Sequence, residues 1–384
     1  MLAFERAEYL GRIAKTKESM ERAGVDVALV INQSNMVYLT GYDGRSDYVP
    51  QMLALASDAP EPKLILRQQD VPCAVHSVFL QTDNIVGYPE DHIGSERKHP
   101  YEYVASLLKD WHLDTRRIGI ERGGAPITPI SFDRLSRALP DVKFTDITGM
   151  IARQRSVKSP QELVYMRQAA SIADLAMQTA IDSIDAGVRQ CDVAAKVMAA
   201  QIRGTPEFGG DRPVSPAMPA GVRTSSPHLS WTDEPYTDAM PINIELGGFR
   251  RRYVAGLSRS IHIGRPPPRL VALHEATKAG MAQALAAAKS GNLCQDVEAA
   301  FRAMTRRHGF EKNSRIGYTI GIDWAENTAS FQRGDMTVLE PDMTFHLMLG
   351  MWYDDWGYTL SETFRITDKG GDSFATLPRE LFVK

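Results

Sequence analysis

The sequence contains little cysteine and no long run of hydrophobic residues, and each shortage excludes a class of protein. Its three cysteines, Cys73, Cys191 and Cys294, are scattered through 384 residues and form no CxxC pair. This spacing argues against a disulfide framework or a thiolate zinc site and favours reduced thiols in the cytoplasm. The N-terminus mixes acids and bases and lacks the apolar core of a signal peptide, and the apolar run at 27–31 is too short to span a bilayer. We therefore expect a cytoplasmic protein that does not enter a membrane.

The chain also lacks a strong excess of charge of either sign. It has 44 Lys and Arg residues against 47 Asp and Glu residues, which gives a formal net charge of −3. Proteins whose main partner is nucleic acid or an anionic membrane typically carry a basic excess, so we expect neither partner. The short basic stretch 250–252 is most simply a solvated turn. The overall composition is that of a soluble globular protein, and the length favours two domains.

The first 155 residues alternate helix-like and strand-like segments. Helices are predicted at 3–23, 101–111 and 130–139, and strands at 25–32, 51–57, 63–69, 116–121 and 142–147. This alternation predicts an α/β domain with a mostly parallel or mixed sheet. A long helix follows, for which Ser159 is a suitable N-cap, Glu162 completes a capping box and Gly187 is the predicted stop. The start of this helix marks a domain boundary, so we predict domains at 1–155 and 156–384.

The second part groups its helices and strands in blocks, which predicts an α+β domain. Further helices are expected at 268–289 and 294–307, and strands at 241–247, 253–264, 343–353 and 358–367. The segment 204–231 is rich in glycine and proline. A loop of that length inside a domain is usually functional or disordered.

Several segments, in this order, resemble the creatinase and aminopeptidase P family, known as the pita-bread fold. They are SVKSPQELVYMRQAASIAD, SSPHLSW, IELGGFRRRYVAGLSRSIHIG, RIGYTIGIDWAEN, VLEPDMTFHLML and GYTLSETFRIT. The resemblance covers nearly the whole chain. It implies a creatinase-type α/β N-terminal domain followed by an α+β pita-bread catalytic domain.

Metal-dependent members of this family hold two divalent ions with two aspartates, one histidine and two glutamates. By position, the resemblance places Glu245 and Gly256 at the aspartates, Tyr318 at the histidine, and Met348 and Glu362 at the glutamates. Glycine and methionine cannot act as ligands for hard metal ions. The resemblance therefore implies no metal site and no cofactor, and it assigns the chain to the metal-free branch of the family.

A carboxylate between apolar neighbours, such as Glu245, needs a metal, a proton or a cation. Without metals, we expect Glu245 and Glu362 to face a cationic substrate, since the N–H groups of an amidinium or guanidinium match carboxylate geometry. Within the metal-free branch the chain resembles ectoine hydrolases more than creatinases, which keep a histidine where Tyr318 stands and a glutamate where Met348 stands. The resemblance implies a hydrolase that opens the cyclic amidine of ectoine to N-acetyl-2,4-diaminobutyrate, in compatible-solute catabolism; use of 5-hydroxyectoine is left open.

His228 is the expected general acid and base, because an ordinary histidine titrates near neutral pH. Glu245 would attack the ring carbon or activate a water, and Glu362 would hold an N–H group. Tyr318 would donate to a developing charge or orient His228. A small zwitterionic substrate also needs an aromatic wall and a basic group. The candidates are Trp324, Trp352, Tyr353 and Trp356 for the wall, Arg223 or Arg333 for the carboxylate, and Tyr48 or Asp47 from the partner subunit of a homodimer.

Each of these residues also has a structural interpretation. His228 could be a surface residue of a proline-flanked loop, either glutamate could be paired with a nearby arginine, and the aromatic residues could belong to the core. Three other functions stay open: a creatinase-like hydrolase of a guanidinium compound, an Xaa-Pro aminopeptidase, and a non-catalytic binding module. The joint presence of His228, Glu245 and Glu362 favours an enzyme.

Overall fold

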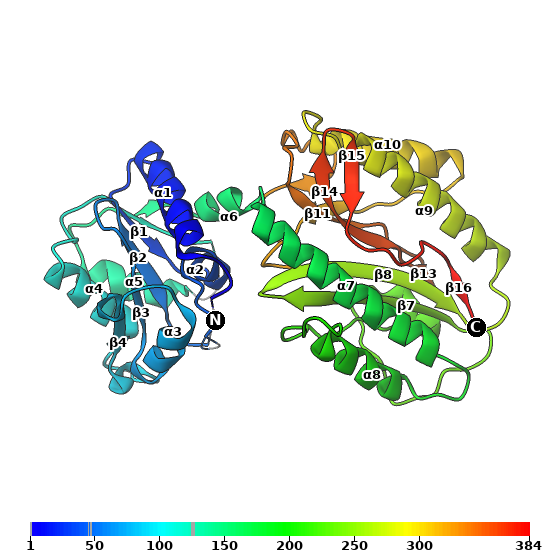
Figure 1. Ribbon diagram of the computed structural model, residues 1–384, viewed down its shortest axis with the longest axis horizontal. Coiled ribbons are helices and arrows are strands. Elements are labelled where there is room, and N and C mark those ends of the chain that lie inside the picture. Colours follow the sequence, from blue (N-terminus) through cyan, green and yellow to red (C-terminus); the bar gives the residue numbers. More distant parts are fainter. Residues whose placement is uncertain (1, 45, 47, 124–126) are drawn as a thin grey trace. The chain divides into compact units, whose positions relative to one another are not determined.

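The computed structural model describes residues 2–44, 46, 48–123 and 127–384, and the chain divides into two units, Met1–Arg155 and Ser156–Lys384 (Figure 1). Asp47, a predicted substrate contact, lies outside the described residues. Each unit has its own sheet and its own hydrophobic core. None of the helices in the described part of the chain combines the length and the apolar character that a membrane crossing requires.

The first unit is built on a six-stranded sheet with the order β4-β3-β2-β1-β5-β6. The strands are β1 Val27–Val30, β2 Met52–Ala56, β3 Lys63–Arg67, β4 Ile85–Tyr88, β5 Ile118–Ile120 and β6 Thr145–Asp146. The helices are α1 Arg6–Arg22, α2 Gln33–Thr40, α3 Val71–Ser77, α4 Pro100–Asp110, α5 Pro129–Ala138 and α6 Met150–Arg155, with 3-10 turns at Gln68–Asp70, Thr82–Asn84 and Glu90–His92. β1 pairs antiparallel with β2 and parallel with β5, so the predicted mixed sheet is confirmed.

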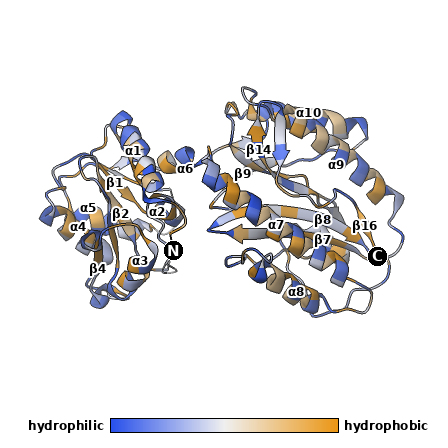
Figure 2. Ribbon diagram, viewed as in Figure 1, coloured by the Kyte–Doolittle hydropathy of each residue, from blue (hydrophilic) through white to orange (hydrophobic). Residues whose placement is uncertain are grey.

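The apolar composition of the central strands explains why they lie inside. β1 and β2 are buried along their whole length, as expected for strands covered on both faces. Figure 2 shows both strands in the colours of hydrophobic residues. Four short elements, α2, α3, α6 and β4, have no counterpart among the predicted segments, and the predicted strand 142–147 shortens to the two residues of β6.

The second unit contains an eight-stranded sheet in which β10-β9-β11-β14-β8-β16 are neighbours, β7 pairs with β8 and β15 pairs with β14. Its strands are β7 Pro241–Arg250, β8 Tyr253–His262, β9 Gly317–Thr319, β10 Ser330–Phe331, β11 Thr344–Met348, β14 Ser361–Thr367, β15 Gly370–Ser373 and β16 Phe382–Val383, with β12 Met351–Trp352 and β13 Gly357–Tyr358 as a separate pair. Its helices are α7 Pro160–Ser183, α8 Gln190–Arg203, α9 Pro268–Ala287 and α10 Cys294–Arg307, with a 3-10 turn at Gly221–Ser225.

The cap predicted for α7 is present. The Ser159 hydroxyl accepts the Glu162 N–H at 3.3 Å, and the Glu162 carboxylate accepts the Ser159 N–H at 2.8 Å. The helix ends at Ser183, before the predicted stop at Gly187. The helix α8, which the sequence pattern did not predict, packs beside α7 and β7 (Figure 1).

One face of the second sheet is covered by helices. α7 lies along β7 and β8 in Figure 1, and α9 and α10 lie beside the strands near the C-terminus. Apolar strand residues fill this covered face: Ile242, Ile244, Leu246, Leu257 and Ile261 pack with α7 and α8, and Phe345, Leu347, Phe364 and Ile366 pack with α9 and α10. Side chains alternate between the two faces of a strand, so the intervening residues point the other way. We call that second face the site face.

Candidate active site

Neighbouring strands bring four side chains into one row on the site face. Glu245 of β7 pairs with Ser258 of β8, Ser258 with Ser361 of β14, and Ser361 with Met348 of β11. Directly paired residues of antiparallel strands project their side chains to the same face. The row therefore joins residues that are far apart in the sequence. In β9 and β11, Tyr318 is paired with His346 in the same way.

A pocket of about 370 Å³ opens at the Glu245 end of this row. Its lining consists of Val214, Ser215, Pro216, Ala217, His228, Ser230, Glu245, Leu246, Gly247, Tyr318 and Trp324. The glycine- and proline-rich loop reaches the pocket because Ala217 and Glu245 exchange two backbone hydrogen bonds of 2.9 Å. The structure thus brings together four residues selected from the sequence. They are His228, which is exposed, and Glu245, Tyr318 and Trp324, which are half-buried.

The Glu245 carboxylate has no counter-charge among the described residues. Burial raises its pKa to about 7, because the ionised form loses water and no described residue supplies it with a cation or a hydrogen-bond donor. The pairing of Glu245 with Arg250, one of the structural interpretations, is not observed. Arg250 donates instead to Gln168 and to the carbonyl of Gly209. An acid that is poised to change charge near neutral pH is a candidate for chemistry or for binding a cation.

The residues at the family's metal positions do not fit a pair of metal ions. Gly256 offers no ligand, and a Cβ placed there would lie 2.8 Å from the His346 ring and 3.1 Å from Trp324, so these two rings fill the space. Burial holds the pKa of Tyr318 at about 12, which keeps its hydroxyl protonated. Among the described residues, no group of three or more His, Cys, Asp or Glu side chains could hold a metal ion. Glu245 is the one carboxylate that remains on the site face at these positions.

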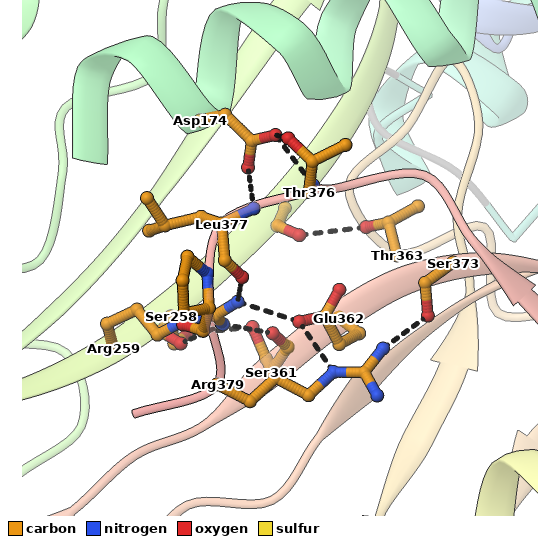
Figure 3. Close-up of polar contacts among 12 residues, drawn as sticks. Asp174, Ser258, Arg259, Ser361, Glu362, Thr363, Ser373, Thr376, Leu377 and Arg379 are labelled. Atoms are coloured by element: carbon orange, nitrogen blue, oxygen red, sulfur yellow. Dashed lines mark hydrogen bonds and ion pairs between the residues drawn. The ribbon is translucent and has the colours of Figure 1, made fainter. Parts of the chain in front are cut away.

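Glu362 lies on the opposite, covered face of the sheet, and its predicted contact with a cationic substrate is wrong. Its Oε1 accepts hydrogen bonds from Arg259 at 2.7 Å and from Arg379 at 3.2 Å, all within the fold (Figure 3). The physical reason is the alternation of β14, which directs Ser361 to the site face and Glu362 away from it. Ser361 is therefore the residue of this strand that belongs to the site.

Arg259 makes this buried ion pair part of a support behind the site. Its guanidinium donates to the carbonyls of Ser258 and Ser361, each at 2.9 Å, and to those of Leu377 and Pro378, each at 2.8 Å (Figure 3). The network ties β8, β14 and the C-terminal segment together. Glu362 thus has the structural role that the sequence left open, with Arg259 and Arg379 as partners.

Two of the predicted aromatic residues do not line the pocket, and the prediction for them is corrected. Tyr353 and Trp356 stack on each other with ring centroids 4.6 Å apart, and the guanidinium of Arg269 lies over both rings. They lie in the turn between β12 and β13, pack against the hydrophobic core and are not among the residues that line the pocket. Trp352 lies closer to the chemistry, since it lines a small recess next to Glu245.

The basic residues proposed for a substrate carboxylate have different surroundings. Arg333 is exposed and does not line the pocket, which argues against that role. Arg223 is half-buried and donates to the carbonyl of Ser230, a pocket residue, at 3.2 Å. Tyr48 belongs to the first unit, is 71% exposed and accepts a hydrogen bond from Arg67. Its contribution to a partner's site stays a prediction.

Sequence reasoning missed His346, Ser258 and Ser361, which form the floor of the site beside Met348. Ser361 donates to Ser258 at 3.0 Å and contacts His346 Nε2 at 2.8 Å. Burial lowers the pKa of His346 to about 3, so its ring is neutral. The signal available in the sequence was the period of two: His346 stands two residues before Met348 and so shares its face.

Comparison with known proteins places these observations in a family. Residues 164–368 match metallopeptidase family M24, and residues 12–157 match the creatinase/prolidase N-terminal domain. The chain is 41% identical to the uncharacterised hydrolase/peptidase y4tL of Sinorhizobium fredii, covering 99% of this chain and 97% of that one. It is 36% identical to the ectoine hydrolase of Halomonas elongata, covering 100% and 99%. The Xaa-Pro dipeptidase of Bacillus anthracis has the same fold, with a TM-score of 0.83, 20% identity and coverage of 98% and 100%. The predicted two-domain pita-bread fold is thereby confirmed.

Proposed function

Because the chain belongs to metallopeptidase family M24 and is a hydrolase, we propose that it opens the cyclic amidine ring of ectoine without a metal ion. The product would be N-acetyl-2,4-diaminobutyrate. The observation that carries the proposal is Glu245, a carboxylate to which no described residue supplies a counter-charge, beside the aromatic rings of Tyr318 and Trp324. A planar cation supplies the missing charge and stacks on such rings. The likeness to an ectoine hydrolase over the full length of the chain supports this substrate.

Substrate binding would prepare Glu245 for the reaction. Because burial raises its pKa to about 7, both the protonated and the ionised form of Glu245 occur near neutral pH. A bound amidinium favours the ionised form, because an adjacent positive charge lowers the pKa of a carboxyl group. Binding and deprotonation are therefore coupled. The substrate itself creates the carboxylate that acts on it.

The chemistry requires one new bond and one broken bond. The carbon between the two ring nitrogens gains an oxygen, either from a water that Glu245 deprotonates or from the carboxylate of Glu245 in a covalent intermediate that water then resolves. One C–N bond of this carbon breaks, and the leaving nitrogen needs a proton. His228 is the proposed donor, since it lines the pocket and its exposure allows it to exchange protons with solvent. Arg223 is the proposed partner of the substrate carboxylate.

Cleavage of Xaa-Pro peptides is the main alternative, because Xaa-Pro dipeptidases are among the relatives of the chain. The family resemblance implies that such peptidases hold two metal ions in the active site. The donor set argues against this function here, since Gly256 and Met348 supply no ligand and the His346 ring fills the space at Gly256. A guanidinium substrate would meet the same carboxylate and aromatic wall and is tested in the same way.

The test follows ring opening of ectoine by NMR, with protein stripped by a chelator and its residual metal quantified. We expect full activity without metal, loss of activity in Glu245→Gln, and unchanged activity in Glu340→Gln, an exposed glutamate of the same unit that serves as the matched control. Activity that returns only with a divalent ion would contradict metal independence. If no condition gives turnover, ectoine is discarded, and creatine and Xaa-Pro peptides are assayed next.

We also propose a homodimer in the cytoplasm, in which the segment 40–51 reaches the site of the partner. The exposed side chain of Tyr48 supports this role, because a residue that meets a partner's substrate must be accessible before assembly. Light scattering should give the mass of a dimer, and Tyr48→Ala should raise KM without changing that mass. A fully active monomer would contradict the arrangement.

A further inference from the structure

A continuous chain of hydrogen bonds crosses the site face behind the pocket. Its members, in order, are Trp324 Nε1, Tyr318 OH, His346 Nδ1 and Nε2, Ser361 Oγ, Ser258 Oγ and Met348 Sδ, with distances of 3.0, 3.5, 2.8, 3.0 and 3.8 Å between successive partners. Only the first two residues line the pocket. His346, Ser361 and Ser258 are buried beneath the pocket, and Met348 is half-buried and lines the small recess next to Glu245.

The two ends of the chain have fixed and opposite roles. The indole N–H of Trp324 can only donate, and the thioether of Met348 can only accept. Ser258 must therefore give its proton to Met348, and Ser361 must give its proton to Ser258. With its own hydrogen used in this way, the Ser361 oxygen faces His346 as an acceptor.

The direction at the serines determines the state of the histidine. His346 Nε2 must carry a hydrogen in order to donate to Ser361 at 2.8 Å. The buried ring is neutral, so its other nitrogen, Nδ1, has a lone pair and no hydrogen. The nearest partner of Nδ1 is the Tyr318 hydroxyl at 3.5 Å, a long contact in which only the tyrosine can be the donor. Every bond of the chain therefore has the same direction, from Trp324 to Met348.

This direction decides what Tyr318 can offer to a bound molecule. Its hydrogen is directed to His346, and one lone pair of its oxygen receives the Trp324 N–H. What remains toward the pocket is a second lone pair, which is an acceptor. Glu245, which lines the same pocket, is an acceptor as well when it is ionised.

We propose that Tyr318 binds the substrate as a hydrogen-bond acceptor, and that its oxygen and the Glu245 carboxylate together select planar cations with N–H groups on both nitrogens. His346 is the positioning residue that makes Tyr318 an acceptor, held in its Nε2–H form by Ser361, Ser258 and Met348. The inference rests on the proposed function for the place where the substrate binds. In this role Tyr318 accepts a hydrogen bond, whereas the sequence suggested that it donates one. The site would then recognise the number of N–H groups on a ligand in addition to its charge.

Two small cations separate N–H recognition from charge recognition. Acetamidinium has N–H groups on both nitrogens, and tetramethylammonium has the same charge with none. By calorimetry, Tyr318→Phe should weaken acetamidinium binding about 10-fold, as expected for a hydrogen bond to a charged donor, and should change tetramethylammonium binding by less than about two-fold. Glu245→Gln should weaken both cations. Acetamidinium binding that is unchanged or tighter in Tyr318→Phe would overturn the inference.

The same measurement separates this inference from the proposed function. If wild-type protein opens ectoine but does not bind acetamidinium, the function stands and the inference fails. If acetamidinium binds with the stated dependence on Tyr318 while ectoine is not opened, the acceptor role stands and the substrate must be another amidinium or guanidinium compound.

The state of His346 gives a readout that does not depend on any ligand. In protein labelled with ¹⁵N-histidine, the ring nitrogens of His346 should report the neutral Nε2–H form throughout the pH range in which an ordinary histidine titrates. The signals are assigned by their loss in His346→Asn, or by their shift in Ser361→Ala if the first variant does not fold. A charged ring or the Nδ1–H form in the wild type would overturn the inference.

Breaking the chain away from the pocket should change recognition inside it. Ser361→Ala removes the acceptor that holds the Nε2–H form, so acetamidinium affinity should fall toward that of Tyr318→Phe. Thr344→Val is the matched control, because Thr344 is a buried residue of the same sheet whose hydroxyl donates to the carbonyl of Ile320 at 2.6 Å and lies outside the chain. It should leave both the histidine signals and the affinity unchanged. Equal losses in the two variants would indicate a merely structural effect and overturn the positioning role.

Discussion

Glu245 and Glu362 are the same residue type in strands of the same sheet, and the fold treats them in opposite ways. Glu362 lies on the covered face, where Arg259 and Arg379 share one of its oxygens. Glu245 lies on the site face, where no described cation meets it. A buried ion pair with several hydrogen bonds connects strands of the fold, whereas a buried carboxylate without a partner is a candidate for binding or catalysis. The surroundings of the two glutamates therefore distinguish a structural role from a functional one, which the residue type does not.

The largest effect should come from the unpaired glutamate. Glu245→Gln keeps the size of the side chain and removes its charge and its basicity, so we expect ectoine turnover to fall by about 10³-fold or more. The free energy of unfolding should stay the same or rise, because the variant has no ionised group to desolvate. Turnover by NMR and urea unfolding measure the two effects. Full turnover of ectoine by Glu245→Gln would contradict the functional role that distinguishes Glu245 from Glu362.

The opposite pattern is expected for the paired glutamate. Glu362→Gln leaves the buried charge of Arg259 without its counter-ion and should lower the free energy of unfolding by about 3 kcal/mol. Urea unfolding measures this loss. The variant that remains folded should keep its affinity for acetamidinium, because Glu362 does not reach the pocket. A loss of affinity without a loss of stability would return Glu362 to the site.

The pH dependence should carry the signature of Glu245. Because its pKa is raised to about 7, kcat/KM should increase as pH rises through 7, by about tenfold per pH unit on the acidic side. Stability has the opposite sign: between the unfolded pKa of about 4.3 and 7, the folded state binds more protons, so raising pH weakens it. Comparison with Glu245→Gln isolates this term. The same stability profile in both proteins would contradict the assignment.

The smallest of these effects should come from Gly256, where the family resemblance places a metal ligand. Gly256→Ala places a methyl group 2.8 Å from the His346 ring, and we expect overpacking to cost about 1–2 kcal/mol of unfolding free energy. Gly291→Ala is no suitable control, because Gly291 has a φ of 88°. Gly11→Ala is suitable, since no described atom outside its own stretch of helix lies within 4 Å of the added methyl group. Equal stability of the two variants would mean that the rings do not fill this space.

Several elements could be predicted because their causes are local. The Ser159 and Glu162 cap depends on residues three positions apart, and the central strands of the first unit are continuous apolar runs. The helix α8 was missed although its alanines favour a helix, because its N-cap residue, Arg189, provides no side-chain cap of the kind that marks the start of α7. In the pocket, His228, Glu245, Tyr318 and Trp324 followed from the positions of the matched segments.

The sequence was a less reliable guide to the face of the sheet to which each strand residue points. Ser361 and Glu362 are adjacent, and matching by residue type selected the carboxylate, although a shift of one residue moves a side chain to the other face. Only the pairing of β14 with β8 and β11 shows that Ser361 belongs to the site. The aromatic candidates Tyr353 and Trp356 were predicted wrongly for a different reason, since they lie in a turn and not in a strand. Composition marked them as a cluster, but the turn that carries them pairs them with Arg269.

The sequence by itself determined the family, the two-domain fold and the presence of Gly256 and Met348 where the resemblance places metal ligands, because these depend on the order of segments and on the identity of single residues. The tertiary structure alone decided which glutamate can bind a substrate. It also decided the donor-to-acceptor direction of the hydrogen bonds that run from Trp324 to Met348. Those properties depend on contacts between β7, β8, β9, β11 and β14, whose residues are more than a hundred positions apart at the extremes. Whether a carboxylate has a functional or a structural role depends on the charged and polar groups that the fold places beside it.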